Sequence, residues 1–328
     1  MGLLMMLGML GLILDGRTAL FGASQGVELC LTSVIPSLLP FLCLSMALTD
    51  RLSGKRLPGS VSKILGIPGG AEALLVPGFL GGYPAGAACI GRAYSAGRLD
   101  RRDAELLLGF CCQPGPAFLF GIAAQQFSSP LAPWALWGCI VLSARATSGL
   151  LPKPSGTARI GGGQSGDALS RAGAAMGKIC LCVILFRVVL SFLTARLHPD
   201  GPGLVILEGI LELTNGCCDL RNIPSEEMRF VAAAGLLSFG GLCVGLQTAQ
   251  VTEGLGLKYY WLGKGLQTVF AILFGFLLVK KRILPAVLLT AALIFLPKAV
   301  AFWKERVYNA YDIQKRSSGR KPCFSEKK

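Results

Sequence analysis

Eight ionisable side chains lie in or beside apolar stretches of this sequence, and their chemistry has to be explained first. A charge at the centre of a bilayer costs about 3 kcal/mol or more, so such residues bind substrate, carry protons or pair with one another. Glu28, Glu105 and Lys264 fit the ends of helices, with the charged group in the membrane interface. The other five are Glu72, Arg145, Arg187, Glu208 and Glu212.

Arg187 lies within ICLCVILFRVVLSFL, too far from either end for its guanidinium to reach water easily. We expect it to pair with a glutamate such as Glu212, and binding of an anionic substrate is the alternative. Glu72 and Glu212 precede two interruptions of apolar segments and are the candidates for proton or cation coupling. The sequence does not identify a coupling ion.

Glycines and prolines interrupt two neighbouring apolar segments. In lipid every backbone polar group must be paired, so a broken helix at membrane depth is tolerated only inside protein or beside a watery cavity. One interruption lies at Pro77 and in the adjoining stretch GFLGGYPAGAACIGRA, at Gly78, Gly81, Gly82, Pro84 and Gly86. The next lies in LLLGFCCQPGPAFLFG, at Gln113, Pro114, Gly115 and Pro116. The pattern predicts a re-entrant hairpin followed by an interrupted helix.

A weak repeat links the first interruption to the second half of the chain. GGYPAG at 81–86 and GGLCVG at 240–245 share the spacing GGxxxG and are 159 residues apart. Glu72 and a break precede the first copy, and Glu208, Glu212 and the break at Thr214, Asn215 and Gly216 precede the second. Small-xxx-small spacing also serves plain helix packing. Paired interruptions in two halves favour a transporter site near the bilayer midplane.

The composition indicates an all-α membrane protein. Mean hydropathy is +0.59, and 52% of the 328 residues are hydrophobic while 15% are charged. We predict a polytopic helical bundle with two related halves, about 16–151 and 172–303, that contain re-entrant hairpins or broken helices. The single membrane domain is 1–303, followed by a basic, disordered tail at 304–328. The expected spans are 27–48, 131–151, 172–193, 228–251, 260–279 and 283–303, with shorter or broken segments at 1–14, 71–93, 104–124 and 204–213.

The net charge of +14 is concentrated at the ends of these segments. The positive-inside rule does not place every basic cluster on one side, and the basic tail favours a cytoplasmic C-terminus. No nucleic-acid partner is expected, because the basic residues are not interleaved with aromatic ones on a soluble surface. The first apolar run lacks a basic n-region and a cleavage site, so we interpret it as a short helix rather than a signal peptide.

Metal, disulfide and enzyme chemistry find little support. The twelve cysteines lack zinc-type spacing and His198 is the single histidine, so no metal or cofactor is expected. The sequence contains no nucleophilic serine motif, no paired intramembrane aspartates and no Walker A loop. We therefore expect a protein that is not an enzyme.

Several motifs in the same order resemble a known family. They are IPSLLPFLCLSMAL at 35–48, GFLGGYPAGA, AELLLGFCCQPGPAFLFG, LEGILELTNG and SFGGLCVGLQTA, and together they cover about 16–276. In these the chain is similar to the YlbJ-type sporulation integral membrane proteins of the nucleoside-recognition (Gate) domain superfamily. It departs from them at Cys112, Gln113 and Pro114, where asparagine, threonine or serine is more usual, which weakens a ligand role there.

The resemblance implies a fold with hairpins and broken helices, like that of nucleoside transporters and the pore region of ferrous-iron transporters. It also implies a role in endospore formation, with dipicolinic acid moved across the outer forespore membrane. Dipicolinate is a planar dianion, which the positive N-terminal ends of broken helices suit. The expected substrate-binding residues are Gly81, Gly82, Tyr83, Pro84, Gly86, Gln113, Pro114, Gly115, Asn215, Gly216, Gly240, Gly241, Gln247 and Thr248, and those for coupling or charge pairing are Glu72, Glu212 and Arg187.

Two alternatives to a transporter or channel for a small anion remain open. One is transport of a nucleoside or another small solute or ion, and the other is a sporulation membrane scaffold that transports nothing. The expected partners are the lipid bilayer, the small solute and, as an open alternative, a second copy of the chain.

Overall fold

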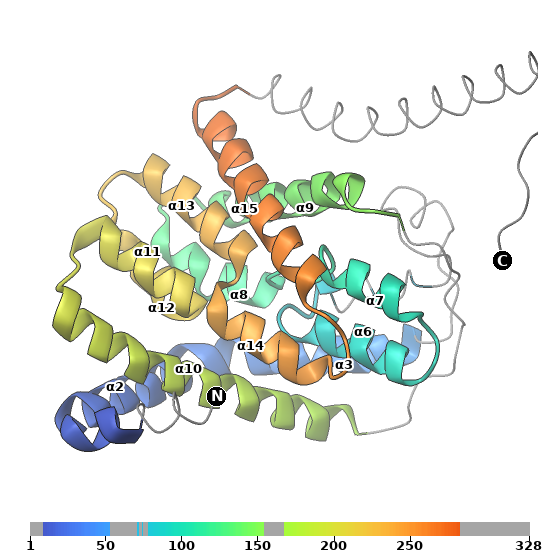
Figure 1. Ribbon diagram of the computed structural model, residues 1–328. Coiled ribbons are helices and arrows are strands. Elements are labelled where there is room, and N and C mark those ends of the chain that lie inside the picture. Colours follow the sequence, from blue (N-terminus) through green and yellow to red (C-terminus); the bar gives the residue numbers. More distant parts are fainter. Residues whose placement is uncertain (1–8, 53–70, 72–73, 75–77, 154–166, 283–328) are drawn as a thin grey trace, which may run out of the picture.

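The computed structural model describes residues 9–52, 71, 74, 78–153 and 167–282, and every regular element in these ranges is helical (Figure 1). The predicted all-α class is confirmed for this part of the chain. The elements in chain order are α2 (Gly16–Leu29), η1 (Cys30–Val34), α3 (Ile35–Leu52), α6 (Ala85–Ser95), α7 (Arg101–Leu108), α8 (Pro116–Gly121), η3 (Ala123–Gln126), α9 (Ala132–Leu150), α10 (Ala168–Leu197), α11 (Gly201–Leu211), α12 (Leu213–Cys218), η4 (Leu220–Asn222), α13 (Glu226–Phe239), α14 (Gly241–Val251) and α15 (Lys258–Val279).

Four helical stretches in the described ranges are long and apolar enough to cross a membrane: Gly16–Leu48, Ala168–Leu197, Glu226–Val251 and Lys258–Val279. They contain four of the six predicted spans. Their outer surfaces carry exposed large apolar side chains, among them Leu20 and Phe21 on α2 and Leu181 and Leu185 on α10. An integral membrane protein accounts for these surfaces, because lipid takes the place of water around them.

The remaining two long spans have different outcomes. Predicted span 131–151 is the helix α9, but it is not among the four membrane-length apolar stretches. Two tryptophans, Pro133 and Arg145 dilute its apolar character, and one face of it is buried against neighbouring helices. Predicted span 283–303, the tail, residues 1–8 and Glu72 lie outside the described residues.

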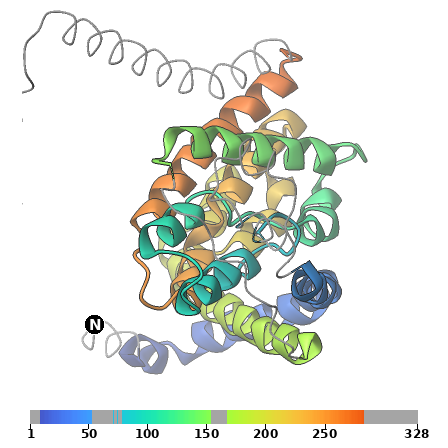
Figure 2. The ribbon, with the colours of Figure 1, turned by 90° about the vertical axis from the view of Figure 1, so that its right-hand side faces the viewer.

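Helices α2, α3 and α10 form one side of the protein (Figures 1 and 2). Gly22 and Gly26 of α2, spaced as small-xxx-small, face α10 so closely that a Cβ atom at Gly22 would lie 2.9 Å from the Cα atom of Val188. At Gly26 it would lie 2.8 Å from the Cα atom of Ile184. The two glycines therefore set the close crossing of these helices, as expected inside a membrane, where close backbone packing replaces the hydrophobic effect.

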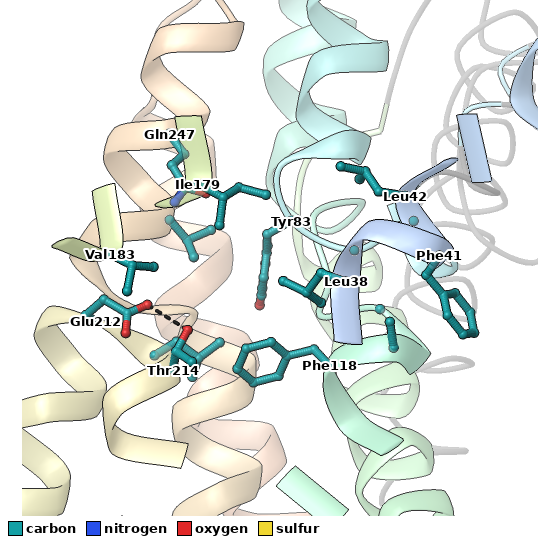
Figure 3. Close-up of a pocket in the computed structure, with 16 residues that line it drawn as sticks. Leu38, Phe41, Leu42, Tyr83, Phe118, Ile179, Val183, Glu212, Thr214 and Gln247 are labelled. Carbon is teal, nitrogen blue, oxygen red and sulfur yellow. Dashed lines mark hydrogen bonds between the residues drawn. The ribbon is translucent and has the colours of Figure 1, made fainter. Parts of the chain in front are cut away.

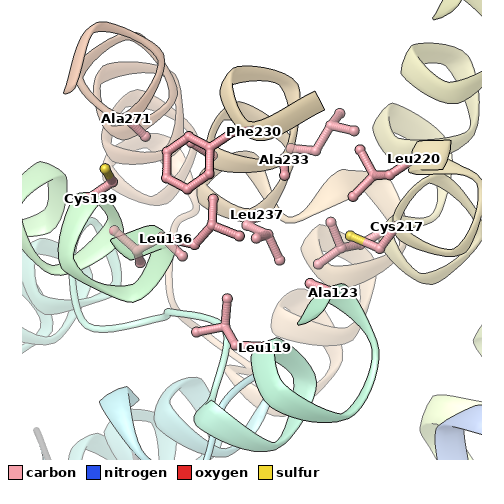
Figure 4. Packing of buried hydrophobic residues seen from close by; sticks show 14 of the residues in the cluster. Leu119, Ala123, Leu136, Cys139, Cys217, Leu220, Phe230, Ala233, Leu237 and Ala271 are labelled. Carbon is pink, nitrogen blue, oxygen red and sulfur yellow. The ribbon is translucent and has the colours of Figure 1, made fainter. Parts of the chain in front are cut away.

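Helices α9, α13 and α15 form the opposite side, and the largest apolar core lies under them (Figure 4). Leu136 of α9, Leu237 of α13 and Ala271 of α15 meet there with Leu119 of α8, and all four are essentially inaccessible to solvent. Between the two sides lie the short helices α6, α7 and α8, each of which has an interruption of the helical chain at one end (Figure 2).

The described chain has four breaks in this central region. Break 1 covers residues 81–84, break 2 covers 109–115, break 3 is Glu212 and break 4 is Gly240. GGYPAG lies at the first break and GGLCVG at the last, so the two motifs do not take corresponding places in the order of breaks. Two related halves are not evident from this order, and the GGxxxG match is better explained by the local needs of each break.

Candidate functional site

Breaks 1 and 2 cross in direct backbone contact. Gly82 has φ +73°, and a Cβ atom there would lie 2.8 Å from the backbone nitrogen of Gly115. At Gly115 a Cβ atom would lie 2.9 Å from the backbone nitrogen of Gly82. No side chain fits between the two loops, which explains why glycine stands at both positions. The two neighbouring interruptions therefore pack directly against each other.

Break 4 contacts breaks 1 and 3. Gly240 (φ +86°) faces the ring of Tyr83, with the position of a Cβ atom 3.1 Å from the Tyr83 hydroxyl. Gly241 (φ +80°) faces the end of α11, where a Cβ atom added to it would lie 3.1 Å from the carbonyl oxygen of Gly209. The four breaks therefore meet in one place, although they lie far apart in sequence.

Side chains of α15 pair the backbone carbonyls that break 2 leaves without helical partners. Lys264 Nζ donates to the Cys112 carbonyl, and Gln267 Nε2 donates to the Gly109 carbonyl at 2.6 Å. Gln113, which we expected to bind substrate, instead donates to Gln267 Oε1 and to the Phe110 carbonyl at 2.9 Å. The position predicted for Lys264, at a helix end in the interface, is wrong: its side chain is fully buried in this network.

Tyr83 links break 1 to the helix that ends at break 4. Its hydroxyl donates to the Leu237 carbonyl at 2.8 Å and accepts from Lys264 Nζ at 3.2 Å. Lys264 Nζ also lies 4.7 Å from the centroid of the Tyr83 ring, a favourable cation–π distance. Tyr83 and Lys264 therefore connect three of the four breaks.

Glu212 caps the short helix that begins at break 3. Its carboxylate accepts from the backbone N–H of Asn215 at 2.9 Å, from the Asn215 amide at 3.0 Å and from the Thr214 hydroxyl at 2.9 Å. The side chain is 2% exposed. A carboxylate at a helix N-terminus is favourable, because free N–H groups and the helix dipole both stabilise the negative charge.

Arg187 pairs with a glutamate, but the partner is Glu208 rather than Glu212. Arg187 Nη1 lies 3.3 Å from Glu208 Oε1 and donates to Asn215 Oδ1 at 3.0 Å, while Nη2 donates to Gln25 Oε1 at 2.7 Å. Glu212 lies one residue further along this chain of contacts, through the Asn215 amide. Glu208 lies in the last turn of α11 and faces α10, whereas Glu212 follows the end of that helix. This difference explains why Arg187 pairs with Glu208.

The helix-end prediction does not hold for Glu28, which lies inside the continuous helical stretch Gly16–Leu48, whereas Glu105 lies in the short helix α7. Glu28 is exposed, and Glu105 accepts from Arg101 Nε at 2.9 Å and from the Gly256 backbone N–H at 2.8 Å. Burial raises the pKa of the Glu105 carboxyl, but the Gly256 N–H and the Arg101 guanidinium outweigh it and hold this pKa below its usual value. Arg145 is 9% exposed and donates to the Ser148 hydroxyl at 3.3 Å.

A cavity of about 40 Å³, the inner cavity, lies where the breaks meet (Figure 3). Its polar lining comes from Tyr83, Glu212, Thr214 and Gln247 and from the glycine backbone of breaks 1 and 2. The rest is apolar, and none of it was predicted: Leu38, Phe41, Leu42, Ala117, Phe118, Ile179, Val183, Leu213 and Val244. In the sequence these residues are parts of ordinary apolar segments, and nothing distinguishes them from their neighbours.

A second cavity of about 200 Å³, the outer cavity, adjoins the first and shares Leu42, Ile179 and Gln247 with it. Its other lining residues belong to α3, α6, α10 and α14 and to break 1: Met46, Pro84, Ala85, Ala88, Arg92, Arg171, Ala174, Ala175, Lys178, Gln250 and Val251. Three of them are cations. The sequence shows these cations only as parts of scattered basic clusters.

The expected binding residues divide between cavity lining and framework. Gly81, Gly82, Tyr83, Gly115, Glu212 and Gln247 line the inner cavity, and Pro84 and Gln247 line the outer one. The others do not line either cavity: Gly86, Gln113, Pro114, Asn215, Gly216, Gly240, Gly241, Thr248 and Arg187. Gly86 and Gly216 instead permit close packing, since Cβ atoms there would lie 2.7 Å from the carbonyl oxygen of Cys111 and 2.4 Å from the Cα atom of Gly209.

Within the described residues no group of three metal-ligating side chains is brought together, and the cysteines there are unbridged. Most of them are buried among apolar residues, where cysteine packs as a small hydrophobe. No protein-family model, no curated protein and no solved structure matches the chain.

Proposed function

We propose that the protein transports a small anionic solute across a membrane, and that the solute passes between the four breaks. The observation that carries this proposal is the inner cavity, which lies among three breaks and the first turns of α14. Irregular backbone at membrane depth is stable only where protein or a solvated cavity pairs it. Here the breaks contact other parts of the protein and also line a cavity. Transporters built from discontinuous helices have the same arrangement.

The two cavities provide a route to this point. They share three lining residues, so a solute that occupies the outer cavity lies next to the wall of the inner one. The inner cavity, at about 40 Å³, holds only a few water molecules. A solute therefore passes only when the breaks separate, and the contact between breaks 1 and 2 acts as a closed gate.

Glu212 couples passage of the anion along this route to binding of a proton or small cation. Its carboxylate lines the inner cavity, and an anion that approaches it is repelled unless the charge is neutralised. A proton or a small cation that binds Glu212 removes the repulsion, so passage of the anion is coupled to that ion. Arg187 lowers the repulsion from a distance, through Asn215, but its direct ion pair is with Glu208.

The substrate within this proposal comes from the sequence resemblance. On this resemblance the chain would be a YlbJ-type protein of the Gate superfamily that moves dipicolinate across the outer forespore membrane. Dipicolinate is a small dianion, and the outer cavity is lined in part by cationic side chains. A nucleoside is the alternative solute. A scaffold that transports nothing would use the breaks for packing alone.

Thermal unfolding of the purified protein distinguishes these solutes. A ligand at one hundred times its Kd stabilises the folded state by about 2.7 kcal/mol. We expect dipicolinate to raise the melting temperature, and uridine and phosphate to raise it less. No shift with any of the three, in protein that unfolds cooperatively, would favour the scaffold.

A further inference from the structure

Lys264 is a buried amine without an anionic partner among the residues that the structure describes. Its side chain is 0% exposed, although α15 has membrane length and faces lipid elsewhere. Nζ donates to the Tyr83 hydroxyl and to the Cys112 carbonyl, which are both neutral acceptors. The ion pairs of the described ranges do not include it. A lysine ammonium has three donors, so one of them has no acceptor in the described part of the chain.

Two tyrosine rings lie beside this amine. Nζ is 4.7 Å from the ring centroid of Tyr83 and 6.0 Å from that of Tyr260. Ring faces at such distances attract a cation but carry no net charge. Burial of an ammonium without a counter-charge is costly, and the rings reduce that cost without neutralising the charge.

The pairing of break 2 does not by itself require a charge at residue 264. Gln267, one turn further along α15, is equally buried and pairs the Gly109 carbonyl of the same break with a neutral amide. An amide at residue 264 could likewise donate to the Cys112 carbonyl and would avoid the burial of a charge. The positive charge therefore needs another explanation.

Lys264 lies directly behind the wall of the inner cavity. Tyr83 lines that cavity, and its hydroxyl accepts from Nζ at 3.2 Å (Figure 3). The two acceptors of Nζ belong to different breaks, Tyr83 to break 1 and Cys112 to break 2. When these breaks separate, Nζ cannot keep both acceptors, and its N–H groups become free where the solute passes. A carboxylate binds an ammonium more strongly than a hydroxyl or a carbonyl does.

We propose that Lys264 is the cationic binding residue for the transported anion, and that a carboxylate of the solute replaces the Tyr83 hydroxyl or the Cys112 carbonyl on Nζ when the gate opens. Lys264 thereby supplies a counter-charge that the described lining of the inner cavity lacks. Arg187 does not supply it, because its ion pair is with Glu208. An anion beside the amine also favours its protonated form, so binding and protonation reinforce each other. This inference rests on the proposed function.

The test is equilibrium binding of dipicolinate to the full-length protein in phosphatidylcholine nanodiscs. Lys264→Gln removes the charge and keeps a donor for the carbonyl of break 2. Lys258→Gln is the matched charge control, because it removes an exposed lysine from the same helix. Gln267→Leu is the structural control, because it removes a donor from the same break and leaves every charge in place.

We expect the Kd for dipicolinate to rise roughly ten- to a hundredfold in Lys264→Gln, as for the loss of a hydrogen bond to a charged group. It should stay close to the wild-type value in Lys258→Gln and Gln267→Leu. An unchanged Kd in Lys264→Gln would overturn the inference. An equal rise in Gln267→Leu would overturn it too, because loosening of break 2 would then explain the loss.

A second measurement uses the wild-type protein and does not depend on how any variant folds. Picolinate carries one carboxylate, and picolinamide has a neutral amide in its place. The wild type should bind picolinate more tightly than picolinamide, and Lys264→Gln should lose this preference. Equal affinity of the wild type for the two compounds would contradict a cationic binding residue.

Uptake of dipicolinate by proteoliposomes keeps this inference apart from the proposed function. Binding that depends on Lys264, without any flux in the wild type, would contradict transport and leave the binding residue standing. Flux whose KM for dipicolinate is the same in the wild type and in Lys264→Gln would contradict the binding residue and leave transport standing.

Discussion

Replacing Gly82 with alanine imposes two separate costs, and other glycines of the chain allow each to be measured alone. Gly82 has φ +73°, and its Cβ atom would lie 2.8 Å from the backbone nitrogen of Gly115. Gly97 has φ +65° with nothing within 4 Å of a Cβ atom. Gly115 has φ −76°, an ordinary conformation, but makes the same contact from the other side.

The magnitudes follow from these geometries. A left-handed conformation costs a residue with a Cβ atom about 1–2 kcal/mol. Overfilling a tight contact costs about 1–3 kcal/mol. We expect Gly97→Ala to show the first cost, Gly115→Ala the second, and Gly82→Ala roughly their sum, about 2–5 kcal/mol.

Thermal or denaturant unfolding of the detergent-purified variants measures the three stabilities, and solute flux is measured in parallel. Flux should fall in Gly82→Ala and Gly115→Ala, which change the contact between the breaks, but not in Gly97→Ala. If Gly82→Ala were no more destabilising than Gly97→Ala, the two breaks would not be in contact. Unchanged flux in both break variants would show that this contact is not a gate.

Three further predictions concern the network around the breaks. Tyr83→Phe leaves the Leu237 carbonyl without its donor and should lower the free energy of unfolding by about 1–3 kcal/mol, measured by denaturant unfolding; no change would mean that water replaces the hydroxyl. Gln267→Leu removes the donor to the Gly109 carbonyl and should cost about as much, whereas Gln125→Leu, at an exposed site, should cost little. Arg187→Met leaves Glu208 buried without its cation and should cost about 3 kcal/mol, and adding Glu208→Gln should recover part of that loss; two additive effects would contradict a direct pair.

The class of fold and the places of three breaks were predictable from sequence because each has a local cause. The predicted break at Thr214, Asn215 and Gly216 is wrong, because these residues form α12 and the chain leaves the helix at Glu212 instead. Long apolar stretches indicate membrane helices, and the glycines of 78–86 indicate where two backbones approach each other closely. The contact of Gly82 with Gly115 was not predicted, because it depends on how the two neighbouring interruptions pack against each other. The helix α9 shows the limit of composition, since it is buried on one face without being apolar enough to count as a span.

The partners at the site were not predictable, because they depend on helices far apart in sequence. Lys264 and Gln267 stand in an apparently ordinary helix, and only the fold brings them to the carbonyls of break 2. The choice of Glu208 over Glu212 for Arg187 depends on where α11 ends. The outer cavity forms because α6 and α10 face each other. Single basic residues and alanines in the sequence do not indicate this arrangement.

Uptake of dipicolinate by sealed proteoliposomes tests the central claim most directly. The wild-type protein should move dipicolinate faster than uridine and faster than empty liposomes do, with a rate that depends on the pH or cation gradient. Glu212→Gln should weaken that dependence, because the neutral amide no longer repels the anion. Well-folded protein that moves no dipicolinate above the empty-liposome rate, whatever the gradient, would contradict the account.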